Sequence, residues 1–275
     1  MTTSTSTSTR MTAPRLGRLI ADGDVEAVRA AVQDSPRLLT ATVERGGQGG
    51  WTPLHVAVAE GRAEVVRLLV ESGTDLSART EHGRDPLHTA LESAPDLVPL
   101  LRELGAPVDA ASAAYLDDVE RLRTELDGGA PLADPVTGVD LLTLAAAGGA
   151  AGTARELLDR GADVDGGALH AAASGTRLEL VRLLVAAGAE VNRRDPDTGR
   201  SPLHAAVAAG GSRDAPGVVR ELLDAGADVN ATTADGASAL DISRVAAARS
   251  RRDDAGQATA HDALADLLVS RGATD

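Results

Sequence analysis

The feature that most constrains how this chain folds is a short sequence pattern that recurs along nearly its whole length. Strong copies stand at 51–57 (Trp-Thr-Pro-Leu-His-Val-Ala), 85–90 (Asp-Pro-Leu-His-Thr-Ala) and 201–206 (Ser-Pro-Leu-His-Ala-Ala), and weaker copies at 140–146, 167–172 and 238–243. Thr52 and Asp85 are 33 residues apart, and Gly167 and Ser201 are 34 residues apart. A period of this size indicates an array of small structural repeats.

A second element follows each copy at a similar offset: an apolar helical stripe that ends in glycine. In EVVRLLVESG, for example, Val65, Leu68 and Leu69 have the spacing of one helix face. The glycines that end these stripes are Gly73, Gly105, Gly129, Gly161, Gly188, Gly226 and Gly272. Glycine adopts the left-handed conformation that stops a helix at low cost, so seven helix ends are predicted here.

Each unit is therefore predicted to be a turn, a short first helix, a tight link and a second helix. Proline fits the first turn of the first helix, and the Thr, Ser or Asp before it can cap that helix. A pair of helices this short cannot bury its apolar face alone, so neighbouring pairs must stack. The sequence predicts an all-α solenoid of stacked helix pairs.

These motifs resemble the ankyrin repeats, whose consensus is built around Thr-Pro-Leu-His-x-Ala-Ala and Gly-Ala-Asp-Val-Asn. The second motif stands as GADVD at 161–165, GAEVN at 188–192 and GADVN at 226–230, and the resemblance covers about residues 16–275. It implies a helix-turn-helix stack with short β-turn or hairpin tips.

The predicted organisation is a disordered Ser/Thr-rich tail at 1–13 and a single ankyrin-repeat domain at 14–275. The domain would hold about seven to eight units, with atypical units as N- and C-terminal caps. An irregular unit near 106–134 lacks the turn and the Pro-Leu-His motif, and a four-residue insertion lies near 211–217. Residues 244–260 either extend the last unit or loop out. Met11 is a second candidate for the true start.

Composition excludes several kinds of chemistry. The chain has no cysteine, which excludes disulfides and thiolate sites, and all 27 basic residues are arginine, which excludes a lysine phosphate loop. The net charge of −14 opposes broad contact with nucleic acid or an anionic membrane, and no apolar run is long enough to span a bilayer. We expect a cytoplasmic protein, and the strong bias to arginine, alanine and glycine suggests a GC-rich bacterial source.

Four of the six histidines occupy the same motif position: His55, His88, His170 and His204. Adjacent helices pack 8–10 Å apart, too far for histidines of successive units to share one metal ion. The resemblance implies instead that this histidine bridges backbone groups of neighbouring turns. A catalytic set of Ser201, His204 and Asp195 can be assembled on paper, but no nucleophile-elbow motif supports it. We therefore predict no catalytic, cofactor-binding or metal-binding residues.

Residues just before the motif, at the end of the first helix and in the longer turns make contacts in ankyrin proteins, and they are the candidates here. They are Trp51, Glu60, Arg79, His82, Arg84, Arg193, Arg194, Asp197 and Arg200. Trp51 is either an exposed hot spot of an interface or a ring that packs on its own turn. The arginines either pair with acidic groups of a partner or with Asp in their own turns.

The function predicted from these features is a non-catalytic, monomeric module that binds a protein partner through its concave face. The acidic charge favours a partner with a basic patch. An alternative is a regulatory or immunity-type inhibitor of a partner enzyme. An enzyme or small-ligand binder that uses the irregular segments 106–134 or 211–217 is a third, weaker alternative.

Overall fold

The computed structural model describes residues 11–253 and 260–274. Their contacts divide the chain into two compact units, residues 1–108 and 109–275, and each unit is described by itself. The predicted tail at 1–13 lies mostly outside the described residues, since only 11–13 are included and the first helix already begins at Ala13. The single ankyrin-repeat domain expected at 14–275 stays a prediction.

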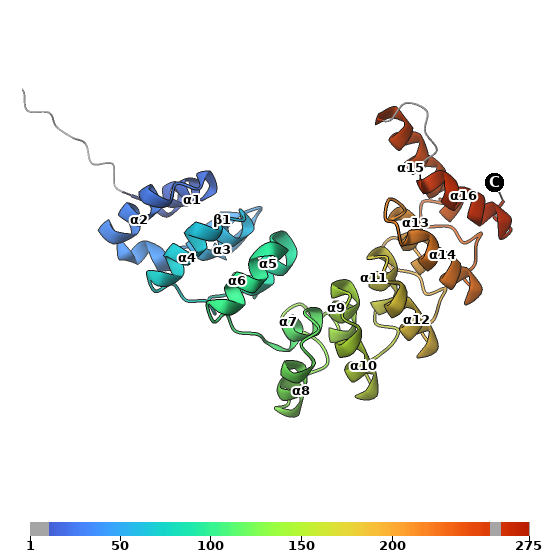
Figure 1. The fold of residues 1–275 in the computed structure, drawn as a ribbon, viewed down its shortest axis with the longest axis horizontal. Coiled ribbons are helices and arrows are strands. Elements are labelled where there is room, and N and C mark those ends of the chain that lie inside the picture. Colours follow the sequence, from blue (N-terminus) through green and yellow to red (C-terminus); the bar gives the residue numbers. More distant parts are fainter. Residues whose placement is uncertain (1–10, 254–259, 275) are drawn as a thin grey trace, which may run out of the picture. The chain divides into compact units, whose positions relative to one another are not determined.

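The first unit contains three helix pairs that stack in two rows (Figure 1). Its elements are α1 (Ala13–Asp22), α2 (Val25–Asp34), η1 (Pro36–Thr40), β1 (Val43–Arg45), β2 (Gln48–Trp51), α3 (Pro53–Ala59), α4 (Ala63–Glu71), α5 (Pro86–Ser93), η2 (Pro95–Leu97) and α6 (Val98–Glu103). The first helices contact one another in the order α1, α3, α5, and α2 contacts α4 in the second row.

The second unit contains five helix pairs with the same two-row arrangement (Figure 1). Its elements are α7 (Ala110–Tyr115), α8 (Val119–Asp127), α9 (Leu141–Gly148), α10 (Ala151–Asp159), α11 (Ala168–Ser174), α12 (Leu178–Ala186), α13 (Pro202–Ala208), α14 (Ala215–Asp224), α15 (Ala239–Asp253) and α16 (Ala260–Ser270). The helices α7, α9, α11, α13 and α15 contact one another in that order, and α8, α10, α12 and α14 form the second row. The predicted all-α stack of helix pairs is confirmed.

The core of both units is built from leucine, valine and alanine. Leu54, Leu87, Leu142 and Leu157 have no exposed surface, and neither have the small residues Ala57 and Ala145 on the same helices. Small side chains at the helix contacts allow the close approach that a stack of short helices needs. No helix in the described part of the chain is long and apolar enough to cross a membrane.

The predicted helix ends are confirmed at all seven glycines. Each follows the second helix of its pair and has a positive φ, from 81° at Gly161 to 95° at Gly188. A residue with a Cβ is strained in this conformation, which explains why the same residue type recurs at the end of each pair.

The predicted capping is confirmed for α3 and α5, the first helices of two pairs. Thr52 accepts a hydrogen bond from the His55 amide at 3.4 Å, and Asp85 accepts one from the His88 amide at 2.9 Å. Each cap precedes a proline in the first helical turn, where the missing amide hydrogen costs nothing.

The glycine-rich run 46–50 forms the turn and part of the second strand of a β-hairpin. Gly46 and Gly47 lie between β1 and β2 with φ of 59° and 78°, as a tight two-residue hairpin turn requires. Within the described residues, the turns at the tips of the repeats contain this hairpin and the isolated β-bridges Ala133–Asp140 and Thr232–Ser238, as the resemblance implies.

The irregular segment 106–134 keeps the helix pair although it lacks the motif. Asp109 replaces the usual cap and accepts a hydrogen bond from the Ser112 amide at 2.9 Å. Asp117, at φ 59°, occupies the link position where other pairs have a glycine, and its carboxylate accepts a hydrogen bond from the Thr153 amide at 2.8 Å. The Thr153 hydroxyl donates to the Ala114 carbonyl at 2.7 Å, which fastens α7 to α10.

The two later irregularities lie in the second unit. The insertion near 211–217 lengthens the link between α13 and α14, where Ser212 shares a 2.9 Å hydrogen bond with Thr176 of the previous pair. Of the segment 244–260, residues 244–253 are part of α15 (Ala239–Asp253), so this part lengthens a helix. Residues 254–259 lie outside the described part.

Candidate interaction surface

The motif histidines link the turns of successive repeats. In the first unit, the His55 Nδ1 accepts from the Thr52 amide at 3.4 Å, and its Nε2 donates to the Arg84 carbonyl of the next turn at 3.0 Å. Burial lowers the pKa of the His55 imidazole, against the opposing effects of this hydrogen bond and of the Asp85 charge. The neutral ring is therefore the form that fits, because one nitrogen accepts while the other donates.

The second unit repeats this link. His170 Nε2 donates to the Arg200 carbonyl at 2.9 Å, so the bridging role implied by the resemblance is confirmed for His55 and His170. His204 is fully buried, and burial lowers its pKa although the backbone of Ala231 and Ala237 opposes the shift. The His55 and His204 rings are buried, and the half-buried His170 ring is held against the next turn.

His88 makes a contact within its own turn. Its Nδ1 lies 3.0 Å from a carboxylate oxygen of Asp85. Burial acts to raise the pKa of Asp85, but the hydrogen bond and charge of His88 outweigh it and hold that pKa below its usual value.

The structure does bring Ser201 and His204 together, with 2.8 Å between the hydroxyl and Nδ1. The Ser201 side chain is buried and caps its helix, as Thr52 does beside His55 at the same 2.8 Å. Asp195 instead accepts hydrogen bonds from the Thr198 amide at 2.8 Å and hydroxyl at 2.6 Å. The three residues therefore do not form a hydrolytic triad.

Two candidate residues, Trp51 and Glu60, meet at Arg45 in the first unit. The Arg45 guanidinium lies 5.5 Å from the centre of the Trp51 ring and forms an ion pair of 2.7 Å with Glu60. The Trp51 ring also meets the His55 ring edge-on, with 6.1 Å between centres. The indole is only partly exposed, so these contacts match a ring packed on its own turn. Sequence reasoning missed Arg45, which the hairpin brings next to the motif.

The following turn of this unit holds Arg79, His82 and Arg84. Arg79 Nη1 donates to the Gly83 carbonyl at 3.0 Å, and Arg84 forms an ion pair with Glu92 at the end of α5. His82 is exposed at the tip of the turn. Arg79 and Arg84 therefore have partners in their own unit, and Arg79 and His82 are both exposed to solvent.

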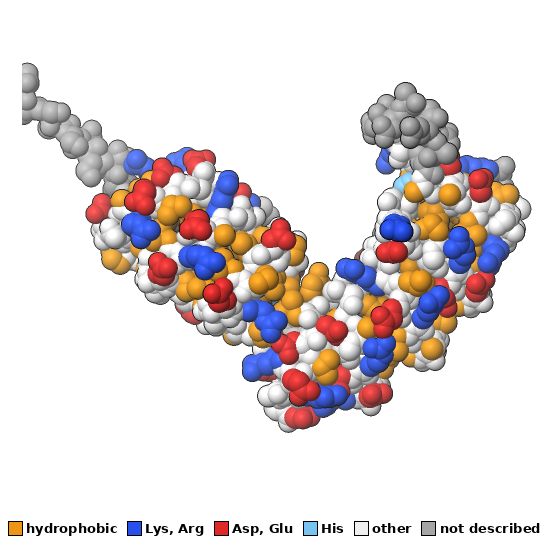
Figure 2. Space-filling view, viewed as in Figure 1, with side chains coloured by type: hydrophobic (Ala, Val, Ile, Leu, Met, Phe, Trp, Pro, Cys, Tyr) orange, Lys and Arg blue, Asp and Glu red, His pale blue; other side chains and the backbone are white. Residues whose placement is uncertain are grey.

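In the second unit the candidates Arg193, Arg194, Asp197 and Arg200 share one long turn. Arg194 Nε donates to the Gly199 carbonyl at 3.1 Å and stiffens that turn. All four residues are exposed. Figure 2 shows acidic and basic side chains interspersed over the visible face.

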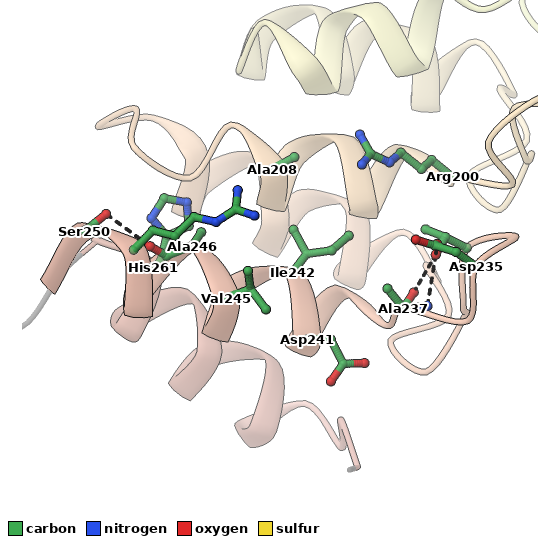
Figure 3. Close-up of a pocket in the computed structure, with 12 residues that line it drawn as sticks. Arg200, Ala208, Asp235, Ala237, Asp241, Ile242, Val245, Ala246, Ser250 and His261 are labelled. Carbon is green, nitrogen blue, oxygen red and sulfur yellow. Dashed lines mark hydrogen bonds between the residues drawn. The ribbon is translucent and has the colours of Figure 1, made fainter. Parts of the chain in front are cut away.

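A cleft of about 580 Å³ lies beside Arg200, between α13 and α15 (Figure 3). Its walls include Ala208 of α13, Val245 and Arg249 of α15, and His261 of α16. Sequence reasoning missed this cleft. Its one sequence signal is the spacing of Asp241, Val245 and Arg249, which are four residues apart and so share one face of α15.

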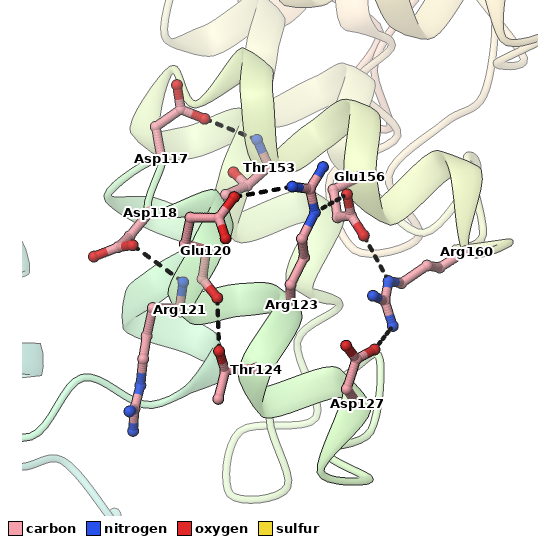
Figure 4. A network of polar contacts seen from close by, with 10 residues as sticks. All are labelled: Asp117, Asp118, Glu120, Arg121, Arg123, Thr124, Asp127, Thr153, Glu156 and Arg160. Atoms are coloured by element: carbon pink, nitrogen blue, oxygen red, sulfur yellow. Dashed lines mark hydrogen bonds and ion pairs between the residues drawn. The ribbon is translucent and has the colours of Figure 1, made fainter.

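A different surface, formed by α8 and α10, carries a network of charges (Figure 4). Arg123 bonds to Glu156 at 2.7 Å and to Glu120 at 2.9 Å, and Arg160 bonds to Glu156 at 2.7 Å and to Asp127 at 2.8 Å. Hydrogen bonds from Arg160 and Arg123 lower the pKa of the Glu156 carboxyl. These charges pair across the two helices, so this surface serves to hold neighbouring repeats in register.

Comparisons with known proteins agree with this architecture. A family model described as ankyrin repeats (3 copies) matches residues 18–112, 108–195 and 142–233. The chain is 30% identical to human Rabankyrin-5 over 169 residues, which are 61% of this chain and 13% of that protein. It is 41% identical to mouse protein phosphatase 1 regulatory subunit 27 over 94 residues, or 34% of this chain and 58% of that protein.

The chain is also 38% identical to human tRNA endonuclease ANKZF1 over 73 residues, which are 26% of this chain and 10% of that protein. The chain thus spans between a tenth and about three fifths of the length of these relatives. The family model covers most of this chain, residues 18–233. The chain belongs to the ankyrin-repeat family.

Proposed function

We propose that this protein is a non-catalytic interaction module that binds a protein partner through the turns and first helices of its repeats. The observation that carries the proposal is that the described residues form consecutive ankyrin helix pairs whose turns present charged side chains to solvent. A stack of this kind offers an extended surface for a macromolecule.

The exposed turn residues are the proposed contacts. His82, Arg193 and Asp197 project from their turns, while Trp51, Glu60, Arg79 and Arg84 are held by neighbours of their own unit and shape the surface around them. In the second unit, Arg194 and Arg200 are exposed on the same long turn as Arg193 and Asp197. The net charge of −14 favours a partner with a basic patch and disfavours nucleic acid and anionic membranes.

A regulatory role is the second candidate function. A regulatory subunit of a phosphatase is among the similar proteins, and binding through a repeat surface is enough to inhibit or position an enzyme. Inhibition of a partner enzyme, including an immunity-type role, differs from the first proposal only in its consequence. We further propose that the protein is monomeric, cytoplasmic and of bacterial origin.

Affinity capture from the source lysate tests the proposal. The bait is the full chain, compared with a variant that carries His82→Ala, Arg193→Ala and Asp197→Ala. A variant with Arg67→Ala and Arg220→Ala is the matched control, because these exposed arginines lie on the second helices α4 and α14. We expect a specific partner that the control retains and the turn variant loses. Equal recovery by all three proteins would place the contact elsewhere, and turnover of a substrate would refute the non-catalytic role.

A further inference from the structure

The cleft between α13 and α15 has the size of a ligand site. Its volume of about 580 Å³ lies within the range of about 300–1,000 Å³ that is typical of binding pockets. Figure 3 shows Arg200, Asp235 and Asp241 toward one end and Ser250 and His261 toward the other, with Ala208, Ile242 and Val245 between them.

The middle of the cleft is apolar. Ala208 of α13 faces Ile242, Val245 and Ala246 of α15, and Val245 is 52% exposed. A large apolar residue that the fold leaves this open gains free energy when a partner covers it, roughly in proportion to the area removed from water. The middle of the cleft therefore suits one apolar side chain of a ligand.

The charged groups of the cleft differ in the number of hydrogen bonds and ion pairs that they make within the protein. Asp241 accepts from the Ser238 amide at 2.9 Å and from the Ser238 hydroxyl at 2.7 Å, and Asp235 accepts from the Thr233 hydroxyl. Within the described residues, the guanidinium groups of Arg200 and Arg249 have no hydrogen bond or ion pair, although the Arg200 charge adds to the Thr233 hydrogen bond in lowering the pKa of Asp235. The carboxylates thus accept hydrogen bonds within the fold, while the N–H donors of both guanidinium groups can bind a ligand.

The length of α15 along the cleft sets a scale for such a ligand. Arg249 follows Asp241 by eight residues on α15, which is about 12 Å along the helix, and Arg200 lies toward the end of the cleft opposite Ser250 and His261. An extended peptide rises about 3.3 Å per residue, so two acidic residues about four positions apart span that distance. The residue midway between them comes to lie over Val245.

We propose that this cleft binds an extended peptide segment of a protein partner in which an apolar residue stands between two acidic residues. The inference rests on the proposed interaction function and names the chemistry of the segment that one part of the surface accepts. It is compatible with a partner that is basic overall. The net charge acts over the whole surface at long range, whereas the two arginines act on groups that enter the cleft.

Selection from a random dodecapeptide library displayed on phage tests this proposal at physiological ionic strength. The baits are the full chain, an Arg200→Gln and Arg249→Gln double variant, and Arg220→Gln as the matched control on the exposed face of α14. Both cleft arginines are exposed, so thermal melting should confirm that the double variant keeps its fold. We expect an enriched pattern of acidic, apolar and acidic residues for the wild type and the control, and its loss for the double variant.

Fluorescence anisotropy of an enriched peptide gives the magnitude. We expect Arg249→Gln alone to weaken the Kd about tenfold or more, because a charge-assisted hydrogen-bonded contact is lost. Replacing both acidic residues of the peptide by glutamine removes both contacts, so it should weaken the Kd as much as the double variant Arg200→Gln and Arg249→Gln does. Val245→Ser should weaken binding of the same peptide if its apolar residue covers Val245.

Several results would overturn the proposal. These are no enriched pattern, a basic pattern, or enrichment that survives in the double variant. A monomer–dimer equilibrium abolished by the two substitutions would assign the cleft to a second copy of this chain. Peptides that depend on His82, Arg193 or Asp197 and not on the cleft would refute this inference and leave the interaction function standing. Failure of lysate capture bears on that function alone.

Discussion

The hydroxyl of Thr153 provides the sharpest test of how the irregular helix pair joins its neighbour. Thr153 is fully buried at the start of α10, and its hydroxyl donates to the Ala114 carbonyl of α7 at 2.7 Å. Thr153→Val replaces that hydroxyl with a methyl group of similar size and keeps the β-branched shape. The bond from the Thr153 amide to Asp117 is retained.

The expected cost follows from leaving a buried acceptor without its donor. Removing one partner of a buried hydrogen bond costs about 1–3 kcal/mol of unfolding free energy. We therefore expect Thr153→Val to destabilise the second unit by about 2 kcal/mol. With a urea dependence of about 2 kcal/mol per molar, the midpoint should fall by about 1 M.

Thr143→Val is a matched control for the same chemical change. The Thr143 hydroxyl, on α9 of the same unit, is buried and has no hydrogen-bond partner within the described residues. Replacing it with a methyl group relieves an unsatisfied polar group, so the effect should be neutral or stabilising. The two variants should differ in sign although both exchange threonine for valine in a helix.

Urea unfolding followed by circular dichroism measures both variants, and hydrogen exchange shows where the effect lies. Because repeat arrays can unfold in parts, the slope of each transition should be compared before free energies are extracted. We expect faster exchange in α7 and α8 for Thr153→Val alone. If Thr143→Val lowers the midpoint as much as Thr153→Val does, hydrogen bonding does not explain how this pair is held.

Three further predictions concern backbone strain, pH and packing. Thr176 has a positive φ of 52°, which strains a residue with a β-branched side chain. The Ser212→Ala substitution removes the hydroxyl partner of Thr176, so in that background Thr176→Gly should raise the unfolding free energy by about 1 kcal/mol. Chemical denaturation of the single and double variants measures this difference. Burial lowers the pKa of His55 and His204, so the unfolded chain takes up protons first as the pH falls below about 6.5. The urea midpoint should therefore decrease from pH 7.5 to pH 5.5, and an increase would contradict this sign. Leu157 has no exposed surface, and Leu157→Ala should cost about 2–5 kcal/mol in thermal or urea unfolding, whereas a cost under 1 kcal/mol would mean that α10 is loosely packed.

The features that sequence reasoning predicted well are those whose cause is local. A stop glycine such as Gly188, or a cap such as Thr52, acts on its own helix, so its residue type and spacing are sufficient. The link between the two helices of a pair is less predictable. Gly23, Gly61 and Gly149 mark it in three pairs, but Asp117 and Thr176 adopt the same left-handed conformation and are not glycine.

The cleft could not be predicted because it joins residues far apart in the chain. Arg200, Val245 and His261 approach one another only through the packing of α13, α15 and α16. The surroundings of Trp51 were missed for a similar reason. The hairpin pairs Val43 with Trp51 and so brings the flanking Arg45 to the indole, and nothing in the repeat motif specifies that register.

The glycines at the ends of the second helices have a stereochemical consequence. At Gly73, Gly188 and Gly226, a side-chain carbon would meet no atom within 4 Å, although φ is between 90° and 95°. Space is therefore available there, and only the handedness of the α-carbon excludes a larger natural residue. A D-alanine introduced by chemical ligation prefers a positive φ, so it would avoid the strain of an L residue at these sites and restrict the unfolded chain more than glycine does.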